Sequence, residues 1–191
     1  HKRLAQIINF LPDATFVIDT QGKVIARDKA MEELTSVSAG EMLGKGNYEY
    51  ALPIYGQRRP LLIDLVLDPK AELESRYTNL TWEGDSVTAE TFLPPQQGSQ
   101  ESYLWGKATT LYDEQGHVIG AIESIRDITE RKHNEDALKE SEAKYKFLVD
   151  NTLDGIFIIQ DWKIKLPNSR MFDITGYSQE EMEQIPVLEF V

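Results

Sequence analysis

An aromatic and basic cluster between residues 48 and 60 offers the best candidate binding chemistry in this 191-residue sequence. Two adjacent arginines end the cluster, and a guanidinium can bind a carboxylate through two parallel hydrogen bonds. Three tyrosines precede them, and two tryptophans further along can join the same pocket. The pattern favours a small anionic metabolite as ligand. The candidate binding residues are Tyr48, Tyr50, Tyr55, Arg58, Arg59, Trp82 and Trp105.

A structural explanation of the same residues stays open. Aromatic side chains often fill a core, and paired arginines are often surface groups or members of salt bridges. In that case Arg58 and Arg59 would pair with Asp64, Glu123 or acidic groups on the surface.

Catalytic and metal-binding patterns are missing from the sequence. The chain has no cysteine, which excludes disulfides, thiolate metal ligands and cysteine nucleophiles. The three histidines, His1, His117 and His133, fall at the terminus, in a predicted turn and in a predicted helix. His133, on a predicted helix, is a candidate phosphoacceptor, but no ATP-binding sequence accompanies it. We therefore expect these residues to be non-catalytic and to hold no metal.

Composition and charge exclude further classes. The formal net charge of −12 argues against nucleic-acid binding, because no basic stripe offsets phosphate charge. A hydrophobic content of 41% is normal for a folded domain, and no apolar run approaches the roughly 20 residues of a membrane span. The sequence begins at His1 with no secretory leader. We expect a cytoplasmic piece of a longer protein that can carry a membrane anchor elsewhere.

The elements that position the candidate residues centre on a hairpin followed directly by a helix. Asp113-Glu114-Gln115-Gly116 is a turn signal between predicted strands at 103–112 and 118–126. A long charged helix is predicted at 129–150, with Asp127 or Thr129 as its cap. A sheet joined to a helix without a spacer can carry a change in the sheet downstream.

The rest of the chain predicts a small antiparallel sheet with short helices, an α+β arrangement. Residues 48–56 are predicted to be irregular, because Pro53 and Gly56 interrupt any element. Further strands are predicted at 15–19, 24–27, 77–82 and 87–93, and helices at 4–11, 28–34, 61–67 and 71–76, with a helical turn capped by Ser38 and Glu41.

An internal repeat divides the sequence. Residues 13–18 (DATFVI) match 154–159 (DGIFII), and residues 31–42 match 171–182, an offset of about 140 residues. The second copy stops before most of its sheet and cannot bury a complete core alone. We expect it to be poorly ordered, or to pack on the long helix or on a neighbouring chain.

On these motifs the chain resembles the PAS (sensory box) family. The resemblance lies in residues 16–19 (FVID), in 112–120 (YDEQGHVIG), in the exit motif 127–131 (DITER), and in 168–178 of the second copy. It implies a PAS fold with a five-stranded antiparallel sheet flanked by short helices. The expected domains are a PAS domain at 1–128, a helical linker at 129–150 and the truncated start of a second PAS domain at 151–191.

The resemblance also implies a function. Tandem PAS domains joined by charged helices are sensors of signalling proteins, most often histidine kinases. We expect a ligand-binding sensor that dimerises through the N-terminal and linker helices, with signal coupling through Asp127, Thr129 and Arg131. The alternatives are an interaction module whose cavity holds no ligand, or the sensor of a cyclic-dinucleotide enzyme or transcriptional regulator.

The cofactors of the family fit the residues poorly. A photoreceptor flavin adduct needs a cysteine, and Ile125 stands where the last strand of such a protein carries glutamine. A haem sensor needs a histidine on its central helix, and none lies in residues 48–77. Haem and covalent flavin are therefore disfavoured, whereas non-covalent FAD stays open.

Overall fold

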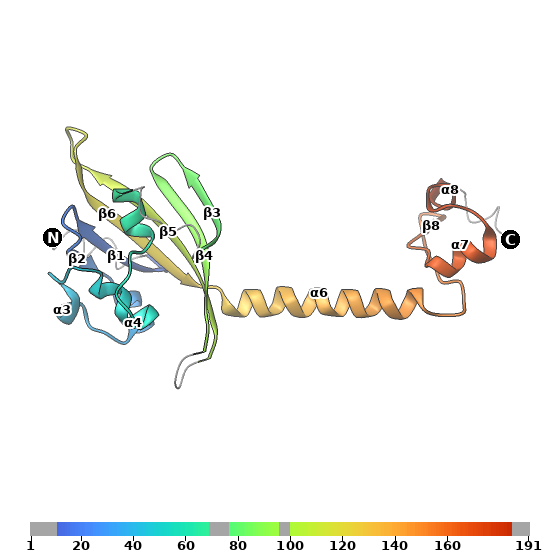
Figure 1. Cartoon of the computed structure of the whole chain (residues 1–191). Coiled ribbons are helices and arrows are strands. Elements are labelled where there is room, and N and C mark those ends of the chain that lie inside the picture. The colour runs from blue at the N-terminus through green and yellow to red at the C-terminus, as the bar shows by residue number, and fades with distance from the viewer. Residues whose placement is uncertain (1–10, 69–76, 96–99, 185–191) are drawn as a thin grey trace. The chain divides into compact units, whose positions relative to one another are not determined.

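The computed structural model describes residues 11–68, 77–95 and 100–184. The chain divides into two compact units, residues 1–132 and 133–191. Predicted helices at 4–11 and 71–76 fall mainly or wholly outside the described residues. Figure 1 shows the elements of both units along the chain.

The first unit is built on a six-stranded antiparallel sheet in the order β2-β1-β6-β5-β4-β3 (Figure 1). The expected count of five strands is wrong, because β3 pairs with β4 and adds an edge strand. The six predicted strand segments are otherwise confirmed to within a residue or two. Their bounds are β1 Ala14–Asp19, β2 Val24–Arg27, β3 Thr78–Glu83, β4 Ser86–Leu93, β5 Ser102–Tyr112 and β6 Val118–Asp127.

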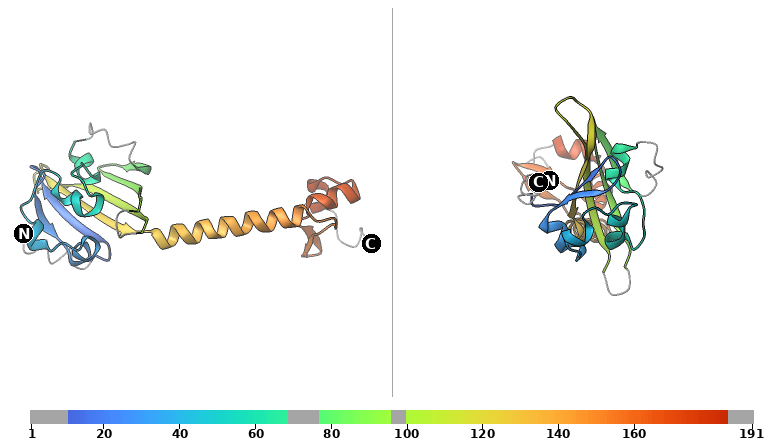
Figure 2. Two further views of the ribbon diagram at one scale, coloured as in Figure 1. Left: turned by 60° about the horizontal axis from the view of Figure 1, so that its bottom comes forward. Right: turned by 90° about the vertical axis from the view of Figure 1, so that its left-hand side faces the viewer.

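Short helices gather on one face of this sheet (Figure 2). The side chain of Asp28 caps the first of them, since its Oδ1 accepts a hydrogen bond from the Met31 amide at 2.7 Å. Ser38 and Glu41 form the predicted capping box of the second. The helices are α2 Lys29–Thr35, α3 Ala39–Met42, the 3₁₀ turn η1 Glu49–Ala51, α4 Leu52–Tyr55 and α5 Leu62–Leu67.

The prediction that residues 48–56 are irregular is wrong for most of the segment. Pro53 falls in the first turn of α4, where its missing N–H removes no helical bond. Gly56 then ends the helix in a left-handed conformation with φ of 68°. Pro53 and Gly56 therefore mark the start and the end of a short helix, α4.

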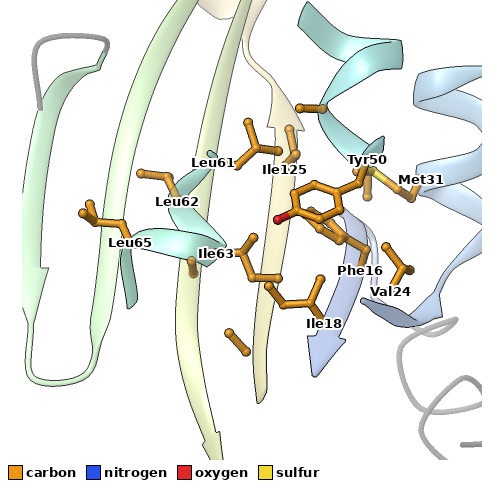
Figure 3. Packing of buried hydrophobic residues seen from close by; sticks show 14 of the residues in the cluster. Phe16, Ile18, Val24, Met31, Tyr50, Leu61, Leu62, Ile63, Leu65 and Ile125 are labelled. Carbon is orange, nitrogen blue, oxygen red and sulfur yellow. The ribbon is translucent and has the colours of Figure 1, made fainter. Parts of the chain in front are cut away.

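The core lies between these helices and the sheet. Phe16 and Ile18 from β1 meet Ile63 from α5 and Met31 from α2, and all four are at most 2% exposed (Figure 3). Buried positions alternate along β4 and much of β5, as expected for strands covered on this face, whereas β1 is buried at five successive positions. The core therefore fixes α5 against β5 and β6, beside the candidate pocket.

The last strand leads directly into α6 Thr129–Asp150, the helix predicted at those residues. Ile128, between strand and helix, is buried, and its amide donates to the Tyr103 carbonyl at 2.8 Å. The Tyr103 amide donates in turn to Thr129 Oγ1 at 2.9 Å. The first residue of the helix is thus bonded to the start of β5.

The second unit repeats the opening elements of the first. Asn168 caps its first helix as Asp28 caps α2, and its side-chain nitrogen donates to the Val149 carbonyl at 2.8 Å. Ser169 Oγ donates to the Asp150 carbonyl. The second copy thus packs on the end of the long helix, one of the expected outcomes. Its elements are β7 Ile158–Gln160, β8 Lys163–Lys165, α7 Ser169–Thr175 and α8 Gln179–Gln184.

Among the described residues, no helix has the length and apolar character that crossing a membrane requires.

Candidate functional site

A small cavity lies between the helices and the sheet of the first unit. Its volume is about 10 Å³, room for about one water molecule. The sheet contributes alternate, inward-facing positions of three neighbouring strands, and α4 and α5 close the opposite side. The lining residues are Tyr55, Leu62, Tyr77, Ala89, Thr91, Leu104, Gly106, Glu123 and Ile125.

Arg59 lies beside this cavity, against two of the aromatic rings that line it. Its guanidinium carbon is 3.8 Å from the centroid of the Tyr55 ring and 5.6 Å from that of Tyr77. Within the part of the chain that the structure describes, the buried Nε and Nη2 of Arg59 and the hydroxyl of Tyr77 have no hydrogen-bond partner. Buried polar groups in folded proteins are nearly always paired, so these three atoms call for an explanation.

Glu123 is the acidic group of the cavity. It is 3% exposed, and its Oε2 accepts a hydrogen bond from the Ile63 amide at 2.9 Å. Burial raises the pKa of Glu123 to about 8; the charge of Asp64 adds to this effect, while the Ile63 amide and the charge of Arg59 oppose it. The carboxyl is therefore mostly neutral at pH 7, and it can donate a hydrogen bond as well as accept one.

A second hydrogen-bonded pair lies nearer the surface. The Tyr50 hydroxyl donates to Asp64 Oδ1 at 2.5 Å, and Asp64 Oδ2 accepts from the Leu61 amide at 2.7 Å. Burial raises the pKa of both Tyr50 and Asp64. Tyr48 and Tyr50 line a separate polar cleft of about 290 Å³ together with Asp64 and Asp68.

The predicted binding residues therefore do not form one site, but lie at the internal cavity, at the polar cleft and on the surface. Tyr55 and Arg59 meet at the internal cavity, whereas Tyr48 and Tyr50 belong to the polar cleft. Arg58 is on the surface and pairs with Glu49 at 3.2 Å, as the structural explanation of the arginines expects.

The two predicted tryptophans do not line the internal cavity. Trp82 is 41% exposed on the edge strand β3. Trp105 is paired across β5 with Glu90 and Arg126, on the face of the sheet opposite to the inward neighbours Leu104 and Gly106. The period of two along a strand separates Trp105 from the cavity.

Sequence reasoning did not select Tyr77, Thr91 or Glu123 as binding residues. Glu123 was named only as a partner for an arginine. The signal was present in β6, where the alternate inward positions are Ala121, Glu123 and Ile125. An acidic residue at an inward position of an otherwise apolar strand indicates a buried functional or paired group.

The predicted coupling residues lie at the junction of sheet and helix. Asp127 Oδ1 accepts a hydrogen bond from the Thr129 amide at 2.8 Å, which is the expected cap. Arg131 Nη2 lies 2.9 Å from Glu90 Oε1, so this helix residue binds strand β4. Glu90 lies between Ala89 and Thr91 in β4. The side chains of these two neighbours line the cavity, on the face of the sheet opposite to the Glu90 side chain.

The remaining sequence signals have structural roles. His117 lies in the β5–β6 turn, as predicted, with its ring nitrogen 3.3 Å from Asp113. Ile125, at the position where flavin proteins carry glutamine, lines the cavity. In residues 11–68, 77–95 and 100–184, no group of three or more potential metal ligands comes together.

Comparison with known proteins identifies the family. A family model described as PAS fold matches residues 8–133, and one described as PAS domain matches residues 143–191. The chain therefore belongs to the PAS family. It contains one PAS domain and a second PAS segment joined to it by α6.

Solved structures similar to this chain include other PAS domains. The PAS domain of BvgS from Bordetella pertussis is 15% identical over 74% of this chain and 96% of its own, with a TM-score of 0.46. A PAS domain from Colwellia psychrerythraea is 20% identical over 68% and 97%, with a TM-score of 0.42. A sensory box histidine kinase from Vibrio cholerae is 13% identical over 67% and 90%, with a TM-score of 0.42. A comparison with curated proteins gave no match.

Proposed function

We propose that this chain is the sensory part of a multidomain signalling protein, in which the first PAS domain binds a small molecule or partner and passes the change through α6. The observation that carries the proposal is the continuity of β6. Glu123 and Ile125 line the cavity, and two residues later Asp127 caps the long helix. A change in the cavity can therefore reach the helix through one strand.

The output domain that we propose is a histidine kinase, with a cyclic-dinucleotide enzyme or a transcriptional regulator as the alternatives. A charged helix between two PAS segments supports a relay of this kind. The protein sequence that surrounds these residues tests the choice. A helix with a phosphoacceptor histidine followed by an ATP-binding domain is the expected result, and a different output domain would exclude the kinase.

An activity assay of the whole protein tests the relay itself. Asp127→Ala removes the cap of α6, at a cost of about 1 kcal/mol, and should uncouple output from the sensor domain. Asp136→Ala, on the exposed part of the same helix, is the control. If the output rate and its response to stimulus are unchanged in Asp127→Ala, Asp127 is a cap and nothing more.

A second candidate function follows from the volume of the cavity. A cavity of about 10 Å³ is filled by side chains and holds no metabolite without moving its walls. This observation favours an interaction module that needs no ligand. Calorimetry and thermal-shift screens separate the two functions, since only the sensor should be stabilised by a small molecule.

The proposed partner is a second copy of the chain, associated through the N-terminal and linker helices. We propose a cytoplasmic location, with which the cysteine-free composition is compatible. A net charge of −12 makes nucleic acid an unsuitable partner.

A further inference from the structure

Two buried donors of Arg59, Nε and Nη2, have the geometry that binds an acceptor with two oxygens. Nε and Nη2 lie on the same edge of the planar guanidinium, and both can donate in parallel to one carboxylate. Both atoms are buried and have no partner within the described ranges. Leaving a buried donor unpaired costs about 1–3 kcal/mol, and more for a charged group. The edge therefore points to an acceptor that the described residues do not supply.

A second arginine in the same sheet domain shows what such an edge binds. Arg126 donates from Nε to Asp13 Oδ1 and from Nη2 to Asp13 Oδ2, at 2.7 Å each. Nε and Nη2 are also the two atoms of Arg59 that have no hydrogen-bond partner within the described ranges. A carboxylate, or another planar anion with two oxygens at the same spacing, fits the edge of Arg59 in the same way.

An aromatic ring packs against the guanidinium of Arg59 and leaves its Nε–Nη2 edge uncovered by a hydrogen-bond partner within the described ranges. The Tyr55 ring covers one face of the guanidinium at 3.8 Å, which partly offsets the loss of hydration. By contrast, Arg27 has one unpaired nitrogen, because its Nη2 donates to the Met31 carbonyl at 2.7 Å. Two adjacent unpaired donors distinguish Arg59 from an arginine with a structural role.

The neighbouring cavity limits the size of the ligand. Its volume is about 10 Å³, and Leu62, Leu104 and Ile125 give it an apolar wall. Any anion larger than a water molecule must displace these walls, and an anion of three or four heavy atoms displaces them least. The buried hydroxyl of Tyr77 lies close to Arg59: burial raises the pKa of Tyr77, and the neighbouring Arg59 side chain opposes this rise.

We propose that Arg59 binds a small planar oxyanion, of the formate or acetate class, through its Nε–Nη2 edge. The inference rests on the proposed sensor function, since it names the ligand class of the same domain. Glu123 and Asp64 are the acidic groups that contribute to the charge around this site, and the charge of Glu123 also acts on the hydroxyls of Tyr50, Tyr55 and Tyr77.

Thermal unfolding of the whole 191-residue chain tests the proposal. Sodium formate, acetate and nitrate are compared with chloride and sulfate at equal ionic strength. A pH near 6.5 keeps Glu123 neutral, so that it does not compete for Arg59. At about ten times the dissociation constant, a planar oxyanion should raise the melting temperature by about 3–6 °C more than chloride. Acids longer than acetate should give progressively smaller shifts.

Three variants assign the effect to the edge. Arg59→Gln should lose the anion-specific shift, and Arg58→Gln should keep it, because Arg58 is an exposed partner of Glu49. Arg59→Lys keeps the charge but not the planar edge, so it should lose the preference for planar anions over chloride. This loss of preference is a result that a purely structural role of Arg59 would not produce.

A spectroscopic measurement covers the case in which Arg59→Gln does not fold. In the wild-type chain, the ¹⁵N–¹H signal of Arg59 Nε should shift on addition of formate and stay in place with chloride. Equal shifts of the melting temperature with all the anions, or an unchanged Nε signal, would overturn the proposal. The sensor function would still stand if Asp127→Ala alters the output of the whole protein.

Discussion

Arg131 Nη2 lies 2.9 Å from Glu90 Oε1, and Lys132 Nζ lies 2.8 Å from Glu90 Oε2. The first turn of α6 is therefore held by a strand that it does not follow in sequence. Glu90 faces away from the cavity, but its neighbours Ala89 and Thr91 line it. A displacement of β4 by a ligand would move the anchor of the helix.

Replacing Glu90 by glutamine should loosen the start of α6. We expect amide hydrogens in the first turn to exchange several-fold faster, with a loss of about 1 kcal/mol in global stability, since this pair is partly exposed. Hydrogen exchange measured by mass spectrometry checks both effects. Glu83→Gln, at an exposed position of β3, is the matched control. Equal exchange in the two variants would mean that Glu90 does not hold the helix.

The same contact has a pH dependence with a definite sign. The hydrogen bond from Lys132 holds the pKa of Glu90 below its usual value. The stabilisation is therefore present above the unfolded-state pKa and is lost as the pH falls through the lower folded-state pKa. Wild type should lose its protection of α6 at acid pH, and Glu90→Gln should show little further change there.

Glu123 should make the domain less stable as the pH rises. Burial raises its pKa from 4.5 to about 8, so the folded state holds the proton that the unfolded state releases. Its stabilising contribution is complete below pH 4.5 and is lost as the pH rises through 8. Between these values the free energy of unfolding should fall by about 1.4 kcal/mol per pH unit from this group alone.

Glu123→Gln isolates this effect, because the amide oxygen can still accept the hydrogen bond from Ile63. Urea unfolding from pH 5 to 9 measures the free energy of unfolding of both proteins. As the pH rises, this free energy should increase in the variant relative to wild type. Glu114→Gln, in the exposed β5–β6 turn, should follow wild type throughout. A constant difference between Glu123→Gln and wild type would show that Glu123 does not titrate in this range.

Gly120 permits a close approach of two strands. A Cβ added at this residue would lie 2.1 Å from the Ile18 carbonyl oxygen, which is backbone and cannot move aside. Gly120→Ala should therefore cost about 3 kcal/mol or prevent folding. Gly116→Ala is the control, because a Cβ there meets open space and only the φ of 84° is unfavourable, at about 1 kcal/mol. Similar urea midpoints for the two variants would contradict this reading of the strand contact.

The sequence predicted the fold well, because its signals are local. The alternation in β4 to β6, the turn at Gly116 and the caps at Asp28 and Ser38 depend on neighbouring residues alone. The number of strands in the sheet was predicted wrongly by the family resemblance, because β3 adds a sixth strand at the edge. The residue pattern at 77–82 predicted a strand, whereas the family implied only five strands in all.

The site was predicted only in part, because its members come from distant segments. Tyr55 and Arg59 were selected by their closeness in sequence, and they do meet. Glu123 is bonded to Ile63, a residue 60 positions away, and no local pattern reveals that contact. Arg131 and Glu90 are 41 positions apart. Trp105 does not line the cavity for another reason. The period of two along β5 places its side chain on the face of the sheet opposite to those of Leu104 and Gly106.

Apolar side chains along α6 form a stripe that suits a second copy of the chain. Leu138, Tyr145 and Leu148 are 57–70% exposed and follow heptad spacing. In a parallel pair of α6 helices these side chains would be buried against each other. We expect Leu138→Ala with Leu148→Ala to raise the dimer dissociation constant at least about tenfold, since each change removes buried apolar volume.

Sedimentation over a range of protein concentrations measures the constant. Lys139→Ala with Lys146→Ala is the matched control, because both residues lie at heptad positions away from the stripe and alanine keeps helix propensity high. The control pair should dimerise like wild type. A wild-type chain that stays monomeric at the highest concentration, or a leucine variant that dimerises equally well, would place the partner surface elsewhere than on α6.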